Sequence, residues 1–322
     1  MARYLNVSYA VNLKTGNMPE PEAVSYQDVW YQSQDGLRLY ARDYHANDKH
    51  AGAAPAILCM HGLTRNSADF EDLCQKLAGS FRLVVAEQRG RGKSQYDSNP
   101  DNYNPAVYVQ DMFTLLRELD ISSAILLGTS MGGIMAMLMA AAKPPMVRGI
   151  ILNDIGPEVA EAGLNRIKSY VGRLAPVNNW DDAAAQCREI NGAAFPGFTQ
   201  AQWLRFAERI YREDSRGKPV LAYDPAISAS LDEDRQPEQS AAPDLWPVFD
   251  SIANQPILVI RGALSDILNH DCLAKMQQIK PDLAVAEIPN VGHAPMLNEP
   301  ESMLAVEGFL DTISGHASSL TA

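Results

Sequence analysis

The sequence predicts an α/β protein in which helices flank a central sheet of mostly parallel strands. Short apolar runs alternate with segments of helical periodicity between residues 56 and 152. Strands linked in this way need crossover helices, and such crossovers place neighbouring strands parallel. One apolar run leads directly into Gly-Thr-Ser-Met-Gly at residues 128–132. The chain has 322 residues, of which 46% are hydrophobic, so a large core can form.

The individual elements follow from the spacing of apolar residues. A hairpin is predicted over residues 28–44, because two β-type segments flank the strong turn signal Asp35-Gly36. A continuous apolar run, typical of a strand buried on both faces, is found at residues 56–60. Further strands are predicted at residues 81–86, 124–128 and 147–152, and buried strands at 256–260 and 284–288. Apolar residues at helical spacing are found at residues 70–78, 105–119, 133–142, 245–252 and 301–313.

The alternation of strands and helices stops after the sixth predicted strand. Residues 156–242 contain helical patterns with no apolar strand between them, so a helical cap is expected to be inserted there. Its helices are predicted at 158–174, 181–190 and 199–212, and the acidic stretch 232–240 is predicted to be a surface loop. We therefore divide the chain into an N-terminal extension (1–24), a core (25–155 and 243–314), the cap (156–242) and a flexible tail (315–322).

Composition restricts the partners and the compartment of the protein. The net charge of −12 argues against nucleic acid and anionic membranes as partners. The N-terminus has no apolar signal region, and no apolar run approaches the ~18 residues needed to span a bilayer. The four cysteines show no paired or metal-like spacing, so they are expected to be free thiols in a reducing compartment. These observations predict a cytoplasmic protein, and they leave its oligomeric state open.

Ser130 is the predicted nucleophile. It lies between an apolar strand and a helix, on a turn that gives a serine unfavourable backbone angles and an exposed hydroxyl. Gly128 and Gly132 are expected because a Cβ atom at either position would crowd this turn. The turn also places Ser130 at a helix N-terminus, where free N–H groups favour negative charge.

A serine nucleophile needs a histidine base in contact with it. His293 follows the last predicted strand, in a loop rich in glycine and proline, and is the predicted base. His270 is the rival, but it is expected to face solvent on a helix. His45 and His50 are predicted to lie in a polar loop, and His316 in the C-terminal tail.

Two aspartates end strands after Ser130, and either could reach the histidine. Asp266 follows the strand at 256–260, and Asp154 follows the strand at 147–152. Asp266 is favoured as the catalytic acid, because the order serine, aspartate, histidine along the chain then matches the usual arrangement on this type of sheet. Asp154 is expected to cap a helix or to line the pocket.

The tetrahedral intermediate of acyl transfer needs N–H donors for its oxyanion. The backbone N–H of Met131, directly after the nucleophile, is one predicted donor. The other is expected from the loop after the strand at 56–60, and Leu63 is the predicted donor there. His61, in the same loop, is expected to bond to the backbone or to lie at the pocket.

No cofactor or metal is expected. The segment Gly90-Arg91-Gly92-Lys93-Ser94 has some likeness to a phosphate-binding loop, but Glu87 stands where a glycine is needed and no helix follows Ser94. It is therefore predicted to be a structural loop at the carboxyl edge of the sheet. No cluster has zinc-ligand spacing, and no dinucleotide fingerprint is present.

Together these motifs resemble the α/β-hydrolase superfamily over residues 30–310. The resemblance depends on His61-Gly62, Arg89 to Ser94, Gly128 to Gly133, Asp266 and Gly292-His293. It is closest in pattern to capped carboxylesterases, lactonases and hydrolases that cut carbon–carbon bonds of ring-cleavage products. A serine at position 130 departs from dehalogenases and epoxide hydrolases of this fold, which have aspartate there.

The resemblance implies a serine hydrolase acting on a small or medium uncharged ester or lactone. Two alternatives remain, a C–C bond hydrolase and a non-catalytic receptor for a small molecule. The cap is expected to cover the active site, and its aromatic residues are candidates for the pocket wall. These candidates are Trp180, Phe195, Trp203, Phe206, Tyr211 and Tyr223.

Overall fold

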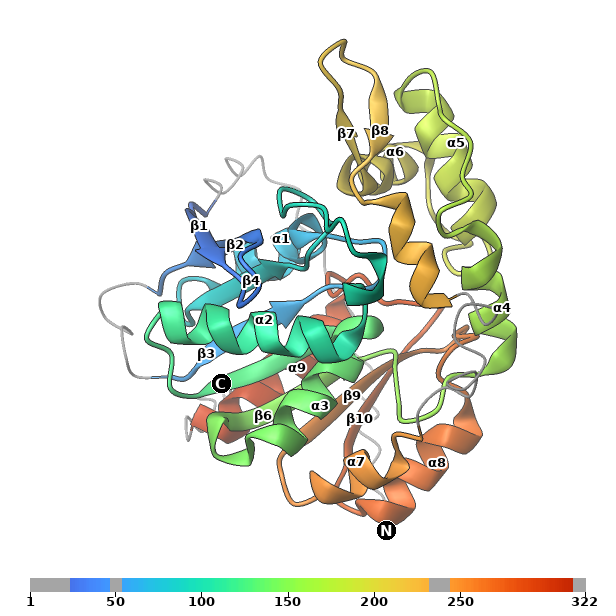
Figure 1. Ribbon diagram of the computed structural model, residues 1–322. Coiled ribbons are helices and arrows are strands. Elements are labelled where there is room, and N and C mark those ends of the chain that lie inside the picture. Colours follow the sequence, from blue (N-terminus) through green and yellow to red (C-terminus); the bar gives the residue numbers. More distant parts are fainter. Residues whose placement is uncertain (1–23, 47–53, 232–243, 315–322) are drawn as a thin grey trace, which may run out of the picture.

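The computed structural model describes residues 24–46, 54–231 and 244–314, and it confirms the predicted fold class (Figure 1). An eight-stranded sheet with the order β1-β2-β4-β3-β5-β6-β9-β10 forms its centre. The strands are β1 (Gln27–Gln32), β2 (Arg38–Tyr44), β3 (Ala56–Met60), β4 (Leu83–Glu87), β5 (Ala124–Thr129), β6 (Val147–Asn153), β9 (Ile257–Gly262) and β10 (Ala284–Ile288).

The first two strands form the predicted hairpin, in which only β2 runs antiparallel to the rest of the sheet. β1 pairs with β2, and β2 with β4, in antiparallel register, whereas all later neighbours are parallel. Gly36 has a φ of +86°, a conformation that glycine adopts without strain, which explains its place in the turn. The parallel strands all end at one edge of the sheet, and the predicted site residues follow these ends.

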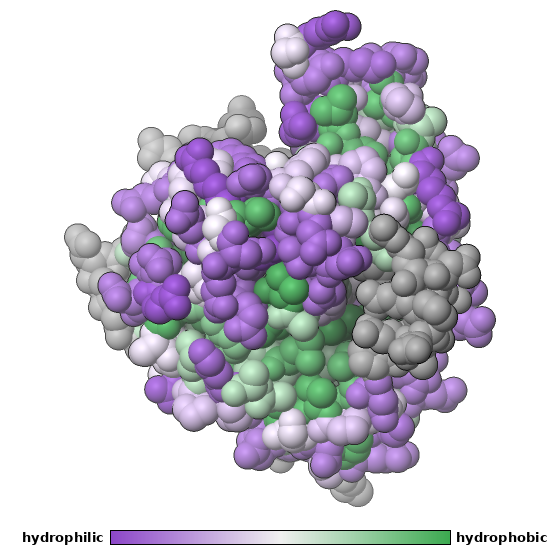
Figure 2. Space-filling view, viewed as in Figure 1, coloured by the Kyte–Doolittle hydropathy of each residue, from purple (hydrophilic) through white to green (hydrophobic). Residues whose placement is uncertain are grey.

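Helices cover both faces of the sheet. The apolar side chains of α1 (Glu71–Leu77) and α9 (Pro300–Ser314) pack on one face. The other face is covered by α2 (Pro105–Glu118), α3 (Met131–Ala142), α7 (Trp246–Ser251) and α8 (His270–Ile279). Figure 2 shows apolar surface between α2 and α7, where α3 lies. The two layers bury the central strands β3, β4, β5 and β9 on both sides. The prediction that the strand at 284–288 is buried is wrong, because β10 lies at the edge of the sheet and leaves Ala284 and Glu287 exposed.

The insertion after β6 stands over one end of the sheet (Figure 1). It contains α4 (Glu161–Tyr170), α5 (Trp180–Asn191), α6 (Gln200–Ile210), the strands β7 (Tyr211–Glu213) and β8 (Pro219–Leu221), and the 3₁₀ helix η4 (Pro225–Leu231). The prediction that this region has no strand is wrong, because β7 and β8 pair as an antiparallel hairpin. Asp214 closes their turn by accepting the backbone N–H groups of Arg216 and Lys218.

Some predictions concern segments that the structure does not describe. The N-terminal extension up to residue 23, the acidic loop at 232–240, the tail at 315–322, and His50 and His316 lie outside the described residues. All four cysteines are described, and each is a buried free thiol. Within the described ranges, no helix combines the length and apolar character needed to cross a bilayer.

Candidate active site

Ser130 lies on a tight turn between β5 and α3. Its φ of 53° and ψ of −116° are unusual for a residue with a side chain, as the sequence predicts for this position. A Cβ atom on Gly128 would lie 2.2 Å from the backbone of Gly132, and one on Gly132 would lie 2.0 Å from the carbonyl oxygen of Met60. The two glycines therefore allow the turn to fold closely onto β3.

A chain of two hydrogen bonds runs from Ser130 through His293 to Asp154. The Nε2 atom of His293 lies 2.9 Å from the Oγ atom of Ser130, and its Nδ1 atom lies 2.8 Å from Oδ2 of Asp154. An ionised carboxylate only accepts hydrogen bonds, so Nδ1 carries the proton and the serine hydroxyl donates to Nε2. The imidazole is thereby set to take the proton of the hydroxyl.

Asp154 is held rigidly at the carboxyl end of β6. Its carboxylate is fully buried and accepts hydrogen bonds from the backbone N–H of Gly262 (2.8 Å) and the hydroxyl of Ser265 (2.6 Å). Its own N–H donates to the carbonyl oxygen of Ile260 at 2.7 Å. Because these partners belong to β9 and the loop after it, the neighbouring strand fixes the acid toward His293.

The prediction that Asp266 contacts the histidine is wrong. Its two carboxylate oxygens accept hydrogen bonds from Nε (2.6 Å) and Nη2 (2.8 Å) of Arg166 on α4. Partial burial favours the neutral carboxyl, but the ion pair with Arg166 outweighs burial and lowers the pKa of Asp266. The loop after β9 turns Ser265 toward the site and Asp266 toward the insertion. His270, the rejected base, is largely exposed on α8, as predicted.

Asn153 was not singled out from the sequence, although it adjoins Asp154. Its amide nitrogen donates to the hydroxyl of Thr129 (3.0 Å) and to the carbonyl oxygen of Pro295 (2.8 Å). Thr129 directly precedes the serine, and Pro295 lies in the histidine loop. Asn153 therefore links the two segments that carry Ser130 and His293. The only available signal was its place at a strand end beside an acid.

The two predicted oxyanion donors flank the serine. Met131 is the first residue of α3, where backbone N–H groups have no partner within the helix. In the described part of the chain, neither its N–H nor that of Leu63 donates to a protein acceptor. Leu63 and Ser130 both line the same pocket.

His61 contacts the backbone of this loop and of the residue that follows β4. It is fully buried, its Nε2 atom accepts the N–H of Gln88 at 3.1 Å, and its Nδ1 atom lies 2.7 Å from the carbonyl oxygen of Gly62. Burial lowers the pKa of His61 to about 3, so the ring is neutral. His61 is not among the described residues that line the pocket. Its ring nitrogens contact backbone groups, which is one of the two roles expected for it.

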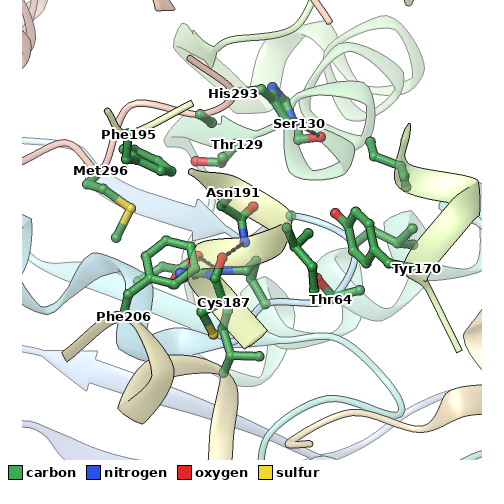
Figure 3. A pocket seen from close by; sticks show the side chains of 18 of the residues that line it. Thr64, Thr129, Ser130, Tyr170, Cys187, Asn191, Phe195, Phe206, His293 and Met296 are labelled. Atoms are coloured by element: carbon green, nitrogen blue, oxygen red, sulfur yellow. Dashed lines mark hydrogen bonds and ion pairs between the residues drawn. The ribbon is translucent and has the colours of Figure 1, made fainter. Parts of the chain in front are cut away.

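A cavity of about 110 Å³ opens beside Ser130 and His293 (Figure 3). Of the aromatic candidates from the insertion, four line it: Phe195, Phe206, Tyr211 and Tyr223. Trp180 and Trp203 are not among the described lining residues, and the same holds for Asp154. The Trp203 ring instead packs against Phe195 and Phe206, and the indole N–H of Trp180 donates to Glu213 on β7.

Two arginines add charge to a mostly apolar wall. Arg65 binds Asp69 through Nε and Nη2, and its guanidinium lies 4.3 Å from the centre of the Phe206 ring. Arg166, paired with Asp266, lines the side formed by α4. Each of these arginines is thus paired with a carboxylate.

Comparison with known proteins gives consistent results. Residues 55–300 match the sequence model of a family described as alpha/beta hydrolase fold. A 3-hydroxybutyrate-oligomer hydrolase of Cupriavidus necator is 34% identical over 80% of this chain and 89% of its own. A 2-(acetamidomethylene)succinate hydrolase of Mesorhizobium japonicum is 29% identical over 82% of this chain and 91% of its own.

Solved structures agree with this comparison. The crystal structure of an alpha/beta hydrolase from Novosphingobium aromaticivorans superposes with a TM-score of 0.81 at 41% identity, and the match covers 89% of this chain and 98% of that one. The family match over residues 55–300 includes the segments that carry Ser130, Asp154 and His293.

Proposed function

The chain belongs to the α/β-hydrolase family, and we propose that it is a serine hydrolase that cleaves carboxylic esters through an acyl-enzyme. The observation that carries the proposal is the pair of hydrogen bonds from Asp154 through His293 to Ser130. We assign Ser130 as the nucleophile, His293 as the general base and acid, and Asp154 as the residue that orients the imidazole. Asp154 replaces Asp266 in this role.

The first half of the reaction makes an ester of Ser130. Its Oγ atom attacks the carbonyl carbon of the substrate while His293 Nε2 takes the hydroxyl proton. The carbonyl π pair moves to oxygen, and the N–H groups of Leu63 and Met131 are proposed to stabilise the resulting anion. When the intermediate collapses, the bond to the alcohol breaks and His293 returns the proton to the leaving oxygen.

The second half repeats these steps with water. His293 takes a proton from the water molecule, and the hydroxide attacks the acyl carbon. Collapse of the second intermediate breaks the bond to Ser130, whose oxygen regains a proton from His293. The carboxylic acid then leaves. No group outside this chain and the two reactants is needed to balance these steps.

The substrate class is proposed from the pocket and from relatives. The cavity of about 110 Å³ holds a short acyl chain, and its wall is largely apolar with paired charges. The Cupriavidus necator relative is named for hydrolysis of 3-hydroxybutyrate oligomers, which are chains of short hydroxyacyl esters. We propose that this protein acts on short-chain esters of this kind. The four free thiols agree with a cytoplasmic location, which belongs to the same proposal.

The test is a panel of p-nitrophenyl esters of rising chain length together with linear 3-hydroxybutyrate dimers and trimers. We expect turnover that is fastest for the shorter acyl chains, with a burst of p-nitrophenol when acylation outpaces release. Ser130→Ala should lower kcat by about 10⁴-fold or more, since the nucleophile is lost. Ser122→Ala, an exposed serine near the opposite end of β5, is the matched control and should keep normal turnover.

The same panel separates the alternatives. Hydrolysis of a vinylogous diketone without any ester turnover would indicate the C–C bond hydrolase. Tight binding of one small molecule with no turnover of any substrate would indicate the receptor. Either result would refute the ester-hydrolase proposal.

A further inference from the structure

Arg91 is fully buried in the loop after β4 that was predicted to be structural. Its Nε–H donates to the carbonyl oxygen of Leu63 at 2.9 Å. Its Nη1 atom donates to the carbonyl oxygen of Arg89 and to the hydroxyl of Tyr108, and its Nη2 atom lies 3.9 Å from the sulfur of Met131. The guanidinium therefore touches both residues whose N–H groups are assigned to the oxyanion.

Arg91 differs from the other buried arginines of the described chain in having no carboxylate in contact. Arg89 bonds to three aspartates, Arg209 to Asp72 and Arg261 to Glu287. All of the hydrogen-bond partners of Arg91 are neutral, and the ring faces of Tyr103 and Tyr108 lie 5.5 and 5.0 Å from it. Burying a charge without a counter-ion is costly, so a neutral side chain would be expected here unless the charge has a use.

We propose that Arg91 is a positioning residue of the oxyanion site, which holds the Leu63 backbone in place and supplies a fixed positive charge behind both N–H donors. This inference rests on the proposed ester-hydrolase function. The developing oxyanion is negative, and a charge fixed in a region of low dielectric acts on it more strongly than one in water. The absence of a carboxylate partner leaves that charge free to act.

The neighbouring histidine lies within the same electrostatic field. Burial lowers the pKa of His61, and the positive charges of Arg91 and Arg65 lower it further. His61 directly precedes Gly62 and Leu63 in the oxyanion loop. The field of Arg91 therefore reaches the segment in which the anion is proposed to form.

The experiment compares Arg91→Met, which removes the charge at similar length, with Arg91→Lys, which keeps the charge but not the planar donor fork. The readouts are kcat and KM for the best ester, and inhibition constants for two matched ketones of the same chain length. The trifluoromethyl ketone forms an anionic adduct with the serine, whereas the methyl ketone binds without forming one. Tyr108→Phe removes one hydrogen-bond partner of Arg91 but leaves the contacts of the guanidinium with Leu63 and Met131, and it is the control.

For Arg91→Met we expect kcat to fall about 10- to 100-fold, which is somewhat less than the fall caused by loss of a direct oxyanion donor. KM should stay within about twofold of the parent value. The trifluoromethyl ketone should weaken by the same factor and the methyl ketone should be unaffected. Arg91→Lys should regain part of the lost affinity, because the charge is retained. Tyr108→Phe should stay within about twofold of the parent in all four measurements, since it leaves the charge in place.

Two results would overturn the inference. One is a folded Arg91→Met that binds the trifluoromethyl ketone as well as the parent. The other is equal weakening of both ketones, which would indicate general damage to the pocket. If Arg91→Met does not fold, as judged by circular dichroism, Arg91→Lys decides: the inference requires the trifluoromethyl ketone to weaken at least about threefold while the methyl ketone does not. A parent protein with neither ester turnover nor ketone binding would refute the proposed function as well.

Discussion

The carboxyl ends of β6 and β9 lie side by side in the sheet, and each is followed by a loop with an aspartate. Asp154, after β6, is fully buried and accepts hydrogen bonds from His293, Gly262 and Ser265. Asp266, after β9, is partly exposed and pairs with Arg166 of the insertion. The same side chain at the same edge therefore contacts His293, the proposed base, in one place and ties the insertion to the core in the other. The difference between the two aspartates comes from their hydrogen-bond partners and not from the strands that precede them.

The largest expected effect is a loss of kcat on substitution of Asp154, which follows β6. Asp154→Asn should lower kcat by roughly 10³- to 10⁴-fold, because the amide no longer stabilises the required tautomer and the positive charge that forms on His293. Steady-state kinetics with the best ester measures the loss, and circular dichroism establishes that the variant is folded. A folded variant that keeps a tenth of the parent rate would show that Asp154 is not the acid.

An intermediate effect is expected for Asn153, the other polar residue at the end of β6. Asn153→Leu removes the hydrogen bonds to Thr129 and Pro295, so the serine and histidine segments are no longer linked. We expect kcat to fall about tenfold, because small displacements of reacting groups are costly. Thr129→Val removes only one of the two hydrogen bonds, and its kcat should fall clearly less than that of Asn153→Leu. Equal losses in the two variants would contradict a linking role.

The smallest effect on turnover is expected on the β9 side. Asp266→Asn should leave kcat within about threefold of the parent, since the residue does not contact His293, but it should lower Tm through loss of the pair with Arg166. A collapse of kcat in this variant would restore Asp266 as the acid.

The pH dependence of Tm gives an independent check of this variant. The pKa of Asp266 is lower in the folded protein than its ordinary value of 3.8. Its contribution to stability is therefore present above about pH 4 and is lost as the pH falls through the folded-state pKa. The difference in Tm between the parent and Asp266→Asn should be present at pH 7 and should shrink below pH 4. A difference that stays constant over this range would contradict the ion-pair explanation.

The fold and the contact between Ser130 and His293 could be predicted because their signals are local. Strand periodicity, the glycines around Ser130 and the loop after the last strand are each contained within a few neighbouring residues. The acid could not be predicted in the same way. Whether Asp154 or Asp266 faces His293 depends on Ser265 and Arg166, and the Arg166–Asp266 pair joins residues 100 positions apart.

The insertion was predicted less well than the core for a related reason. Residues 199–212 have helical spacing, but the chain leaves α6 after Ile210 and enters β7, where pairing with β8 overrides local preference. The residues that line the pocket were difficult to predict for the same reason. Phe206 lines the cavity and Trp203, three residues earlier on α6, packs into the aromatic cluster beside it. Which face of a helix meets a cavity is decided by packing partners that the helix sequence does not contain.

The position of Asp154 before the insertion has a consequence for how this architecture can be altered. A Cβ atom on Gly156 would lie 2.8 Å from the sulfur of Cys272 on α8, so the chain is still tightly packed against the core two residues after the acid. A chimera that takes up a foreign lid from Pro157 onward would retain serine, histidine and acid together. The contacts that tie the insertion to the core, among them the pairs Arg166–Asp266 and Arg209–Asp72, would have to be rebuilt, whereas the sequence of the segments that carry Ser130, Asp154 and His293 would be unchanged.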